Sequence, residues 1–164
     1  MRRLLLPALL FAALAIGMTV PSVMCLSISS RKHPGKMVLS TRALSGFTIS
    51  YTHSVNKGRV RDYYLVQDGM IVLHKTEFVS YGAGIPEAYE TAGAEFTVTK
   101  SGYAITGLDR RLRQMVMAVG VIAGHSFSAG DNDVPLTDYF EPQTSLVFEA
   151  RKVPLAAYIF SKHI

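Results

Sequence analysis

The sequence predicts an all-β domain, an antiparallel β-sandwich or a partly closed barrel, preceded by an N-terminal hydrophobic helix. Short segments with alternating apolar and polar residues recur along the chain, and turns containing Gly, Pro, Asn or Asp separate them. No long amphipathic helical pattern follows the first 24 residues. The length of 164 residues suits one domain with its own hydrophobic core.

The N-terminal segment has the pattern of an export signal or a membrane anchor. Arg2 and Arg3 precede an apolar run from Leu4 to Val20, and the next charged residue is Arg31. The uncharged stretch reaches the roughly 20 residues that span a bilayer. Because the basic residues precede the run, the remaining chain is expected on the extracytoplasmic side of the membrane.

These features divide the chain into three parts. Residues 1–24 are expected to form a signal peptide or membrane anchor, residues 25–153 the β-domain, and residues 154–164 a C-terminal tail. The protein is therefore expected to be exported, either periplasmic or at the cell surface. If the leader is not cleaved, residues 4–24 anchor the chain in the cytoplasmic membrane.

Five strands are expected in the first half of the chain. The strongest pattern follows Gly46, where residues alternate strictly between an apolar and a polar face. The pair Asp68–Gly69 is a strong hairpin signal between two later strands. The expected strands are Cys25–Ser29, Met37–Ser40, Phe47–Val55, Val60–Val66 and Met70–Val79.

Four further strands are expected in the second half. The segment Leu108–Arg113 is interpreted as a charged connector between two of them. The segment Gln114–Phe127 is apolar on both faces, which is typical of a central strand or one that crosses between sheets. Leu155–Phe160 is an apolar segment without an assigned structure. The expected strands are Glu95–Thr99, Tyr103–Thr106, Gln114–Phe127 and Ser145–Val153.

Composition excludes several classes of function. The formal net charge is +5, and Arg2 and Arg3 supply two of its 17 basic residues. No basic cluster is interleaved with aromatic residues, so no nucleic-acid partner is expected. Cys25 is the only cysteine, which excludes an intramolecular disulfide or a multi-cysteine metal site.

Two segments carry the polar residues that attract functional interest. The first is Tyr51-Thr52-His53-Ser54-Val55, and the second is Phe78-Val79-Ser80-Tyr81-Gly82-Ala83-Gly84-Ile85-Pro86. Strand alternation places His53 on the apolar face and Ser54 on the opposite face, so these neighbours are not expected to act as a base and nucleophile.

Together with the Arg-rich segment that leads to Gly124-His125, these motifs resemble the domain-of-unknown-function family 1850 (DUF1850) over most of the chain from Cys25 to Lys152. Asp62 stands where the family pattern more often has Glu. Members are typically small exported or anchored proteins, often encoded beside TRAP transporters of the TAXI type. The resemblance implies an accessory domain whose partner is the transporter permease or its solute-binding protein.

The polar residues of these segments also allow two other functions. A small-ligand or metal-binding module could use His53, Glu77, Ser80 and His125, although no cofactor is expected. A hydrolase with His53 as base is a further alternative, but no complete catalytic motif is present and an enzyme is not expected. The candidate ligand or interaction site comprises Tyr51, His53, Ser54, Asp62, Glu77, Ser80, Gly82, Gly84, Arg110, Arg111 and His125.

Overall fold

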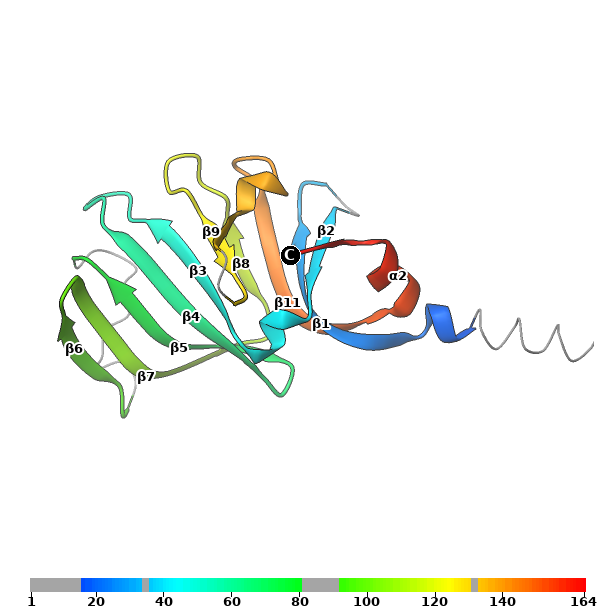
Figure 1. The fold of residues 1–164 in the computed structure, drawn as a ribbon, viewed down its shortest axis with the longest axis horizontal. Helices are drawn as coiled ribbons and strands as arrows, with labels where there is room; N and C mark the ends of the chain where they lie inside the picture. The colour runs from blue at the N-terminus through cyan, green and yellow to red at the C-terminus, as the bar shows by residue number, and fades with distance from the viewer. Residues whose placement is uncertain (1–15, 34–35, 81–91, 131–132) are drawn as a thin grey trace, which may run out of the picture.

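The computed structural model describes residues 16–33, 36–80, 92–130 and 133–164, which form two β-sheets (Figure 1). The expected all-β architecture is confirmed. The two sheets do not close into a barrel, because each keeps two edge strands among the described residues. No helix among the described residues is long and apolar enough to cross a membrane.

The first sheet has five strands and contains both chain ends of the β-domain. Its order is β12-β2-β1-β11-β8, with antiparallel neighbours except for β12, which runs parallel to β2. The longest pairing joins β1 to β11, from Pro21 opposite Pro154 to Ser30 opposite Leu146. The strands are β1 (Pro21–Ser30), β2 (Met37–Ser40), β8 (Met115–Ala118), β11 (Ser145–Pro154) and β12 (Lys162–His163).

The second sheet has seven antiparallel strands in the order β10-β9-β3-β4-β5-β7-β6. Asp68 and Gly69 both have positive φ angles and form the expected turn between β4 and β5. The strands are β3 (Phe47–Thr52), β4 (Arg59–Gln67), β5 (Met70–Phe78), β6 (Glu95–Thr99), β7 (Gly102–Leu112), β9 (Ser126–Ser128) and β10 (Asp133–Pro135).

One hydrophobic core joins the two sheets. The ring of Phe47 on β3 stacks against Tyr64 and Phe127 in its own sheet, at centroid distances of 5.0 and 5.6 Å. It also stacks against Phe148 of β11 in the other sheet, at 6.4 Å. We call the face of the seven-stranded sheet that carries Phe47 the inner face, and the opposite face the outer face.

Two sequence predictions in the second half are wrong. The segment Leu108–Arg113 is not a connector, because β7 continues through it to Leu112. The single strand expected over Gln114–Phe127 is instead two short strands in different sheets, β8 and β9. A loop between them returns at Gly124, whose φ of 54° is accessible to glycine at little cost.

The ends of the chain add elements that the pattern did not assign. Strand β1 begins at Pro21, within the segment attributed to the leader, and the described part of the expected N-terminal helix is a short helical stretch at residues 16–19. The remainder of that helix lies outside the described residues. Near the C-terminus, helix α2 (Leu155–Phe160) follows β11, and β12 then pairs with β2. Two short 3-10 helices, at Arg42–Ser45 and Leu136–Asp138, complete the described fold.

Replacing Phe47 by Ala is expected to lower the free energy of unfolding by about 3–5 kcal/mol, because its ring contacts both sheets. Urea denaturation measures this change. Val121→Ala is the control, because Val121 lies in a loop and is 63% exposed. Its expected effect stays within about 0.5 kcal/mol. An equally small effect for Phe47→Ala would contradict the assignment of this ring to a shared core.

Candidate functional site

A polar cluster interrupts the apolar inner face of the seven-stranded sheet. Asp62 on β4 lies opposite Ile49 on one neighbouring strand and Thr76 on the other, so its carboxyl group points to the inner face. Both Thr76 and Tyr51 donate side-chain hydrogen bonds to this carboxyl group. Such partners are needed because an unpaired carboxyl group away from water is costly.

Burial raises the pKa of the Asp62 carboxyl group above its ordinary value. The hydrogen bonds from Thr76 and Tyr51 and the positive charge of Arg110 oppose this effect without cancelling it. Burial, followed by the charge of Asp62, also raises the pKa of the Tyr51 hydroxyl, so Tyr51 remains a donor. We call Tyr51, Asp62 and Thr76, together with His125, the inner cluster. Its carboxyl group is easier to protonate than one in water.

His125 closes the cluster on the side of β9. Its ring stacks on Tyr51 with a centroid distance of 5.5 Å, and its Nδ1 accepts a hydrogen bond from the Gly120 N–H at 3.0 Å. Burial and the charge of Arg59 lower the pKa of His125, which favours the neutral ring that this bond requires. The residue therefore fixes the loop between β8 and β9 against Tyr51.

His53 has a comparable role in the turn between β3 and β4. Its side chain is buried, and Nδ1 accepts a hydrogen bond from the Val55 N–H at 3.2 Å. Ser54 is exposed, and its carbonyl oxygen accepts a bond from Lys57 Nζ at 2.6 Å. The structure therefore shows His53 supporting the turn, with Ser54 in a different environment.

The remaining predicted site residues are divided between the two faces. Glu77 lies on the outer face opposite Arg61, and accepts hydrogen bonds from Tyr63 Oη at 2.6 Å and Lys75 Nζ at 2.7 Å. Although burial raises the pKa of Glu77, the bonds from Lys75 and Tyr63 lower it below its ordinary value. Glu77 therefore stays ionised on the face opposite to Asp62.

The two expected arginines also separate. Arg110 pairs with Leu73 on the inner face, whereas the next residue, Arg111, lies on the outer face and binds Asp109 through Nε at 2.9 Å. The carbonyl oxygen of Ser80 accepts a hydrogen bond from Asn56 Nδ2 at 2.8 Å, which links the second motif to the turn that follows the first. Gly82 and Gly84 lie outside the described residues.

The outer face contains a depression that the sequence did not single out. We call it the hydroxyl–arginine depression. Its volume is about 340 Å³, and its lining consists of Thr48, Ser50, Arg61, Tyr63, Ser128, Gly130 and Asp133. Ser50 is only 1% exposed, and its Oγ has no hydrogen-bond partner in the described structure. A buried hydroxyl without a partner is uncommon, and it leaves a donor for a ligand.

Arg59 adds a second positive charge beside this depression. From β4 its guanidinium donates to the Gly124 carbonyl oxygen at 3.1 Å and to Ser126 Oγ at 2.8 Å. Because β3 lies between β4 and β9, the Arg59 side chain crosses over β3. Ser126 pairs with Ser50, which pairs with Arg61, so hydroxyl and guanidinium groups follow one row across the sheet.

Thr76, Ser50, Arg59 and Arg61 were not among the predicted site residues. Thr76 was detectable in principle, since it lies two residues before Phe78 and so shares its face. The outer-face row required knowledge of strand order, because Ser126 is 76 residues from Ser50 in the chain. Within the described residues, no group of three or more His, Cys, Asp or Glu side chains is placed to hold a metal ion.

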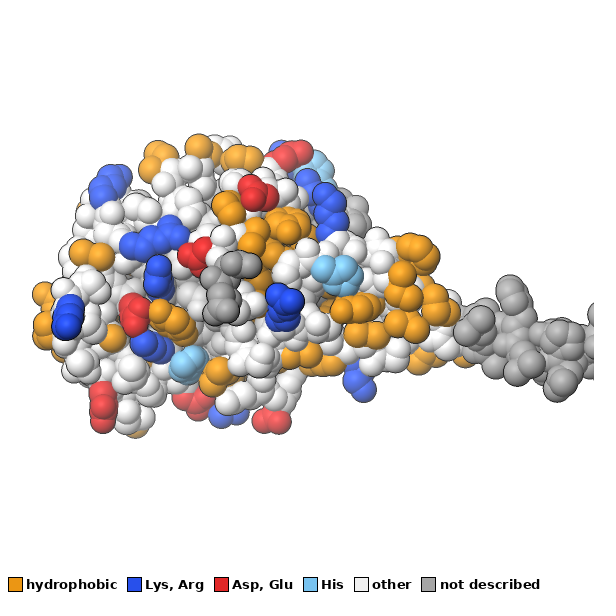
Figure 2. Space-filling view, in the orientation of Figure 1, with side chains coloured by type: hydrophobic (Ala, Val, Ile, Leu, Met, Phe, Trp, Pro, Cys, Tyr) orange, Lys and Arg blue, Asp and Glu red, His pale blue; other side chains and the backbone are white. Residues whose placement is uncertain are grey.

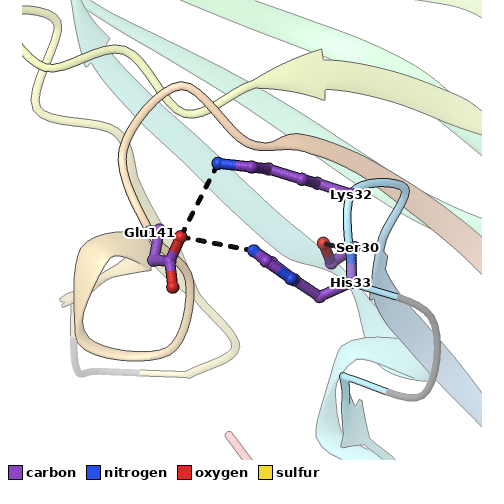
Figure 3. A network of polar contacts seen from close by, with 4 residues as sticks. All are labelled: Ser30, Lys32, His33 and Glu141. Carbon is purple, nitrogen blue, oxygen red and sulfur yellow. Dashed lines mark hydrogen bonds and ion pairs between the residues drawn. The ribbon is translucent and has the colours of Figure 1, made fainter.

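A separate polar network lies at the surface, where two loops meet (Figure 3). Glu141 accepts from His33 Nε2 at 3.3 Å and lies 3.8 Å from Lys32 Nζ, and Ser30 Oγ accepts from the His33 N–H at 2.9 Å. The hydrogen bond and charge of His33 lower the pKa of Glu141. These contacts join the loop after β1 to the loop before β11.

The sequence profile of the family described as "Domain of unknown function (DUF1850)" matches residues 47–136, more than half of the chain. The matched segment begins with β3 and contains Tyr51, Asp62, Thr76 and His125, so the whole inner cluster falls within it. The comparisons with curated proteins and with solved structures found no match.

Replacing Asp62 by Asn tests the buried carboxyl group. A raised folded-state pKa gives stability that is present below the unfolded-state pKa, near 3.8, and is lost as the pH rises through the folded-state value. Asn stays uncharged, so the unfolding free energy of Asp62→Asn relative to wild type is expected to increase from pH 4 towards pH 7. Urea denaturation at several pH values measures this difference.

Asp109→Asn is the matched control for this prediction, since Asp109 is an exposed carboxylate on the same sheet. The pH-dependent gain should belong to Asp62→Asn. The same profile for both variants, or a gain for Asp62→Asn that shrinks with pH, would show that Asp62 carries no raised pKa.

Proposed function

This chain belongs to the DUF1850 family, and we propose that it is an extracytoplasmic, non-catalytic accessory domain of a TAXI-type TRAP transporter. Its N-terminal apolar segment would hold it at the outer side of the cytoplasmic membrane. The family resemblance supplies the transporter context, and the basic residues before the apolar run support the orientation.

The observation that carries this proposal is the position of residues 16–20 at one end of the molecule (Figure 1). The far edge of the seven-stranded sheet, β6, lies at the opposite end of the same view. A chain held at the membrane by its N-terminal segment would therefore leave the large sheet free for a protein partner.

A binding role is favoured over catalysis by how the histidines are used. Both His53 and His125 accept backbone N–H groups through Nδ1 and thereby fix loops. Glu77, one of the two acids that a hydrolase centred on His53 could use, instead binds Tyr63 and Lys75 on the outer face. A nucleophile, a base and an orienting acid must lie within hydrogen-bond reach of one another.

A second candidate function is the binding of a small oxyanion in the hydroxyl–arginine depression. The unpartnered Ser50 Oγ favours it, because a hydroxyl beside Arg61 can donate to the same oxyanion that the guanidinium binds. The carboxylate of Asp133, which also lines the depression, would repel ligands with a high negative charge. In this candidate the ligand site lies on the outer face of the sheet, whereas the His125 ring stacks on Tyr51 of the inner cluster.

Purification of the tagged full-length chain from detergent-solubilised membranes tests the transporter proposal. We expect the permease or the solute-binding protein to co-purify. The control is the same leader fused to an unrelated soluble domain, which should recover neither component. Absence of both components from the eluate, when both are detected in the starting membranes, would contradict the proposal.

Thermal unfolding with inorganic phosphate or with acetate tests the oxyanion site and separates the two kinds of ligand. A bound oxyanion raises Tm with concentration, by an amount equivalent to about 2.7 kcal/mol when it reaches 100 times its Kd. Arg61→Gln should abolish the rise. Arg42→Gln, at an exposed arginine in a 3-10 helix, should retain it. Equal responses of both variants would exclude the depression as the binding site.

A further inference from the structure

Helix α2 has two apolar faces, and only one of them is packed against the domain. Ala157 and Tyr158 contact a small core of Cys25, Leu39 and Val153. The other apolar side chains remain in contact with solvent, with exposed fractions of 37% for Leu155, 54% for Ile159 and 84% for Phe160. Exposed apolar area of this kind is unfavourable in water unless another surface covers it.

The described N-terminal residues add to the same surface. Ile16 is 62% exposed and Val20 is 49% exposed. The short segment 16–20 that carries them lies at the end of the molecule where α2 is found (Figure 1). Figure 2 shows hydrophobic side chains gathered at this end. We call Ile16, Val20, Leu155, Ile159 and Phe160 the end patch.

We propose that the end patch is a membrane-contact surface, in which Leu155, Ile159 and Phe160 enter the interfacial region of a lipid bilayer. Helices that lie in the interface of a bilayer bury an apolar face at the boundary between headgroups and acyl chains, and the face of α2 that is not packed on the domain is available for this contact. This inference rests on the part of the proposed function in which the N-terminal segment stays in the membrane.

Two observations select lipid as the occupant. The sequence is uncharged from Leu4 to Ser30, so the apolar N-terminal run passes directly into the end patch without a polar spacer. A chain anchored by that run holds the patch at the bilayer surface, where the effective concentration of lipid is high. In addition, the exposed Lys152 and Lys162 flank α2 in the sequence, and cationic residues beside an apolar face are attracted to anionic lipids.

A second contact would change what the anchor does. A single transmembrane segment holds a domain near the bilayer but leaves it free to rotate. Because α2 packs on Cys25 and Leu39 of the five-stranded sheet, insertion of the helix into the bilayer would fix the orientation of that sheet. The seven-stranded sheet would then present the same faces to every partner.

The absence of tryptophan from the sequence allows a direct test. Phe160→Trp introduces the only tryptophan, conservatively, into the end patch. Ile122→Trp is the matched control, because Ile122 is 81% exposed in the loop between β8 and β9. Both full-length variants are reconstituted into phosphatidylcholine vesicles containing phosphatidylglycerol, with and without phosphatidylcholine brominated near the headgroup end of its acyl chains.

We expect the Phe160→Trp emission to move to shorter wavelength and to lose intensity in brominated vesicles, whereas the Ile122→Trp emission does neither. Quenching of Phe160→Trp no greater than that of Ile122→Trp would overturn the proposal. A blue shift that depends on protein concentration, without quenching by bromine, would also overturn it and assign the patch to a second copy of the chain. The quenching is measured without any transporter, so this result and the co-purification can fail independently.

Discussion

The strict alternation of β3 and β4 is the constraint on which the rest of the structure depends; β5 departs from it at a bulge between Leu73 and Lys75. Neighbouring side chains point to opposite faces of the sheet. The register that buries Phe47, Ile49 and Val60 on the inner face therefore places Ser50 and Arg61 on the outer face. A shift of one residue would exchange the two sets and place guanidinium groups in the core. The same register therefore fixes the core, the inner cluster and the hydroxyl–arginine depression.

The position of Asp62 is the point where this alternation carries a cost. A carboxyl group stands at an inner-face position whose neighbours are Ile49 and Thr76, and its raised pKa is the sign that burial outweighs its hydrogen bonds. An apolar residue would pack there without that penalty. The cluster built around it, with Tyr51 hydrogen-bonded to Asp62 and stacked on His125, is more elaborate than the fold requires. Clusters of this kind are candidates for functional sites.

Much of the fold was predictable because local pattern and tertiary role agree. Strand β2 coincides with its predicted bounds, and the Asp68–Gly69 turn forms where the dipeptide indicates it. The failures occur where pattern and role diverge. Charged residues at the end of β7 are compatible with a strand whose side chains reach solvent, and they concealed its true length. In β8 and β9, apolar residues on both faces indicated a central strand or a crossing between sheets; the chain does change sheets, but the pattern did not reveal the loop that divides the segment into two strands.

The candidate site was less predictable than the fold for a related reason. His53 is buried and Ser54 is exposed, as expected, but β3 ends at Thr52, short of the predicted Val55, so both residues lie in the turn rather than on the strand whose alternation predicted this. The pairing of Asp62 with Thr76, and of Ser50 with Ser126, depends on which strands lie side by side. Both glycines of the second motif, Gly82 and Gly84, lie outside the described residues, so the structure describes only Phe78, Val79 and Ser80 of that motif.

If the end patch contacts the membrane as proposed, the length of β1 and β11 sets the distance from the patch to the far ends of these strands. Both strands have one end at the end patch, near Pro21 and Pro154, and the other near Ser30 and Ser145. Ten residues at roughly 3.3 Å each place the far end about 30 Å from the patch. The loops at that end contact one another through Glu141 and His33. Under the proposed membrane contact, a soluble partner would reach these loops, whereas a partner embedded in the membrane would meet the chain closer to the end patch.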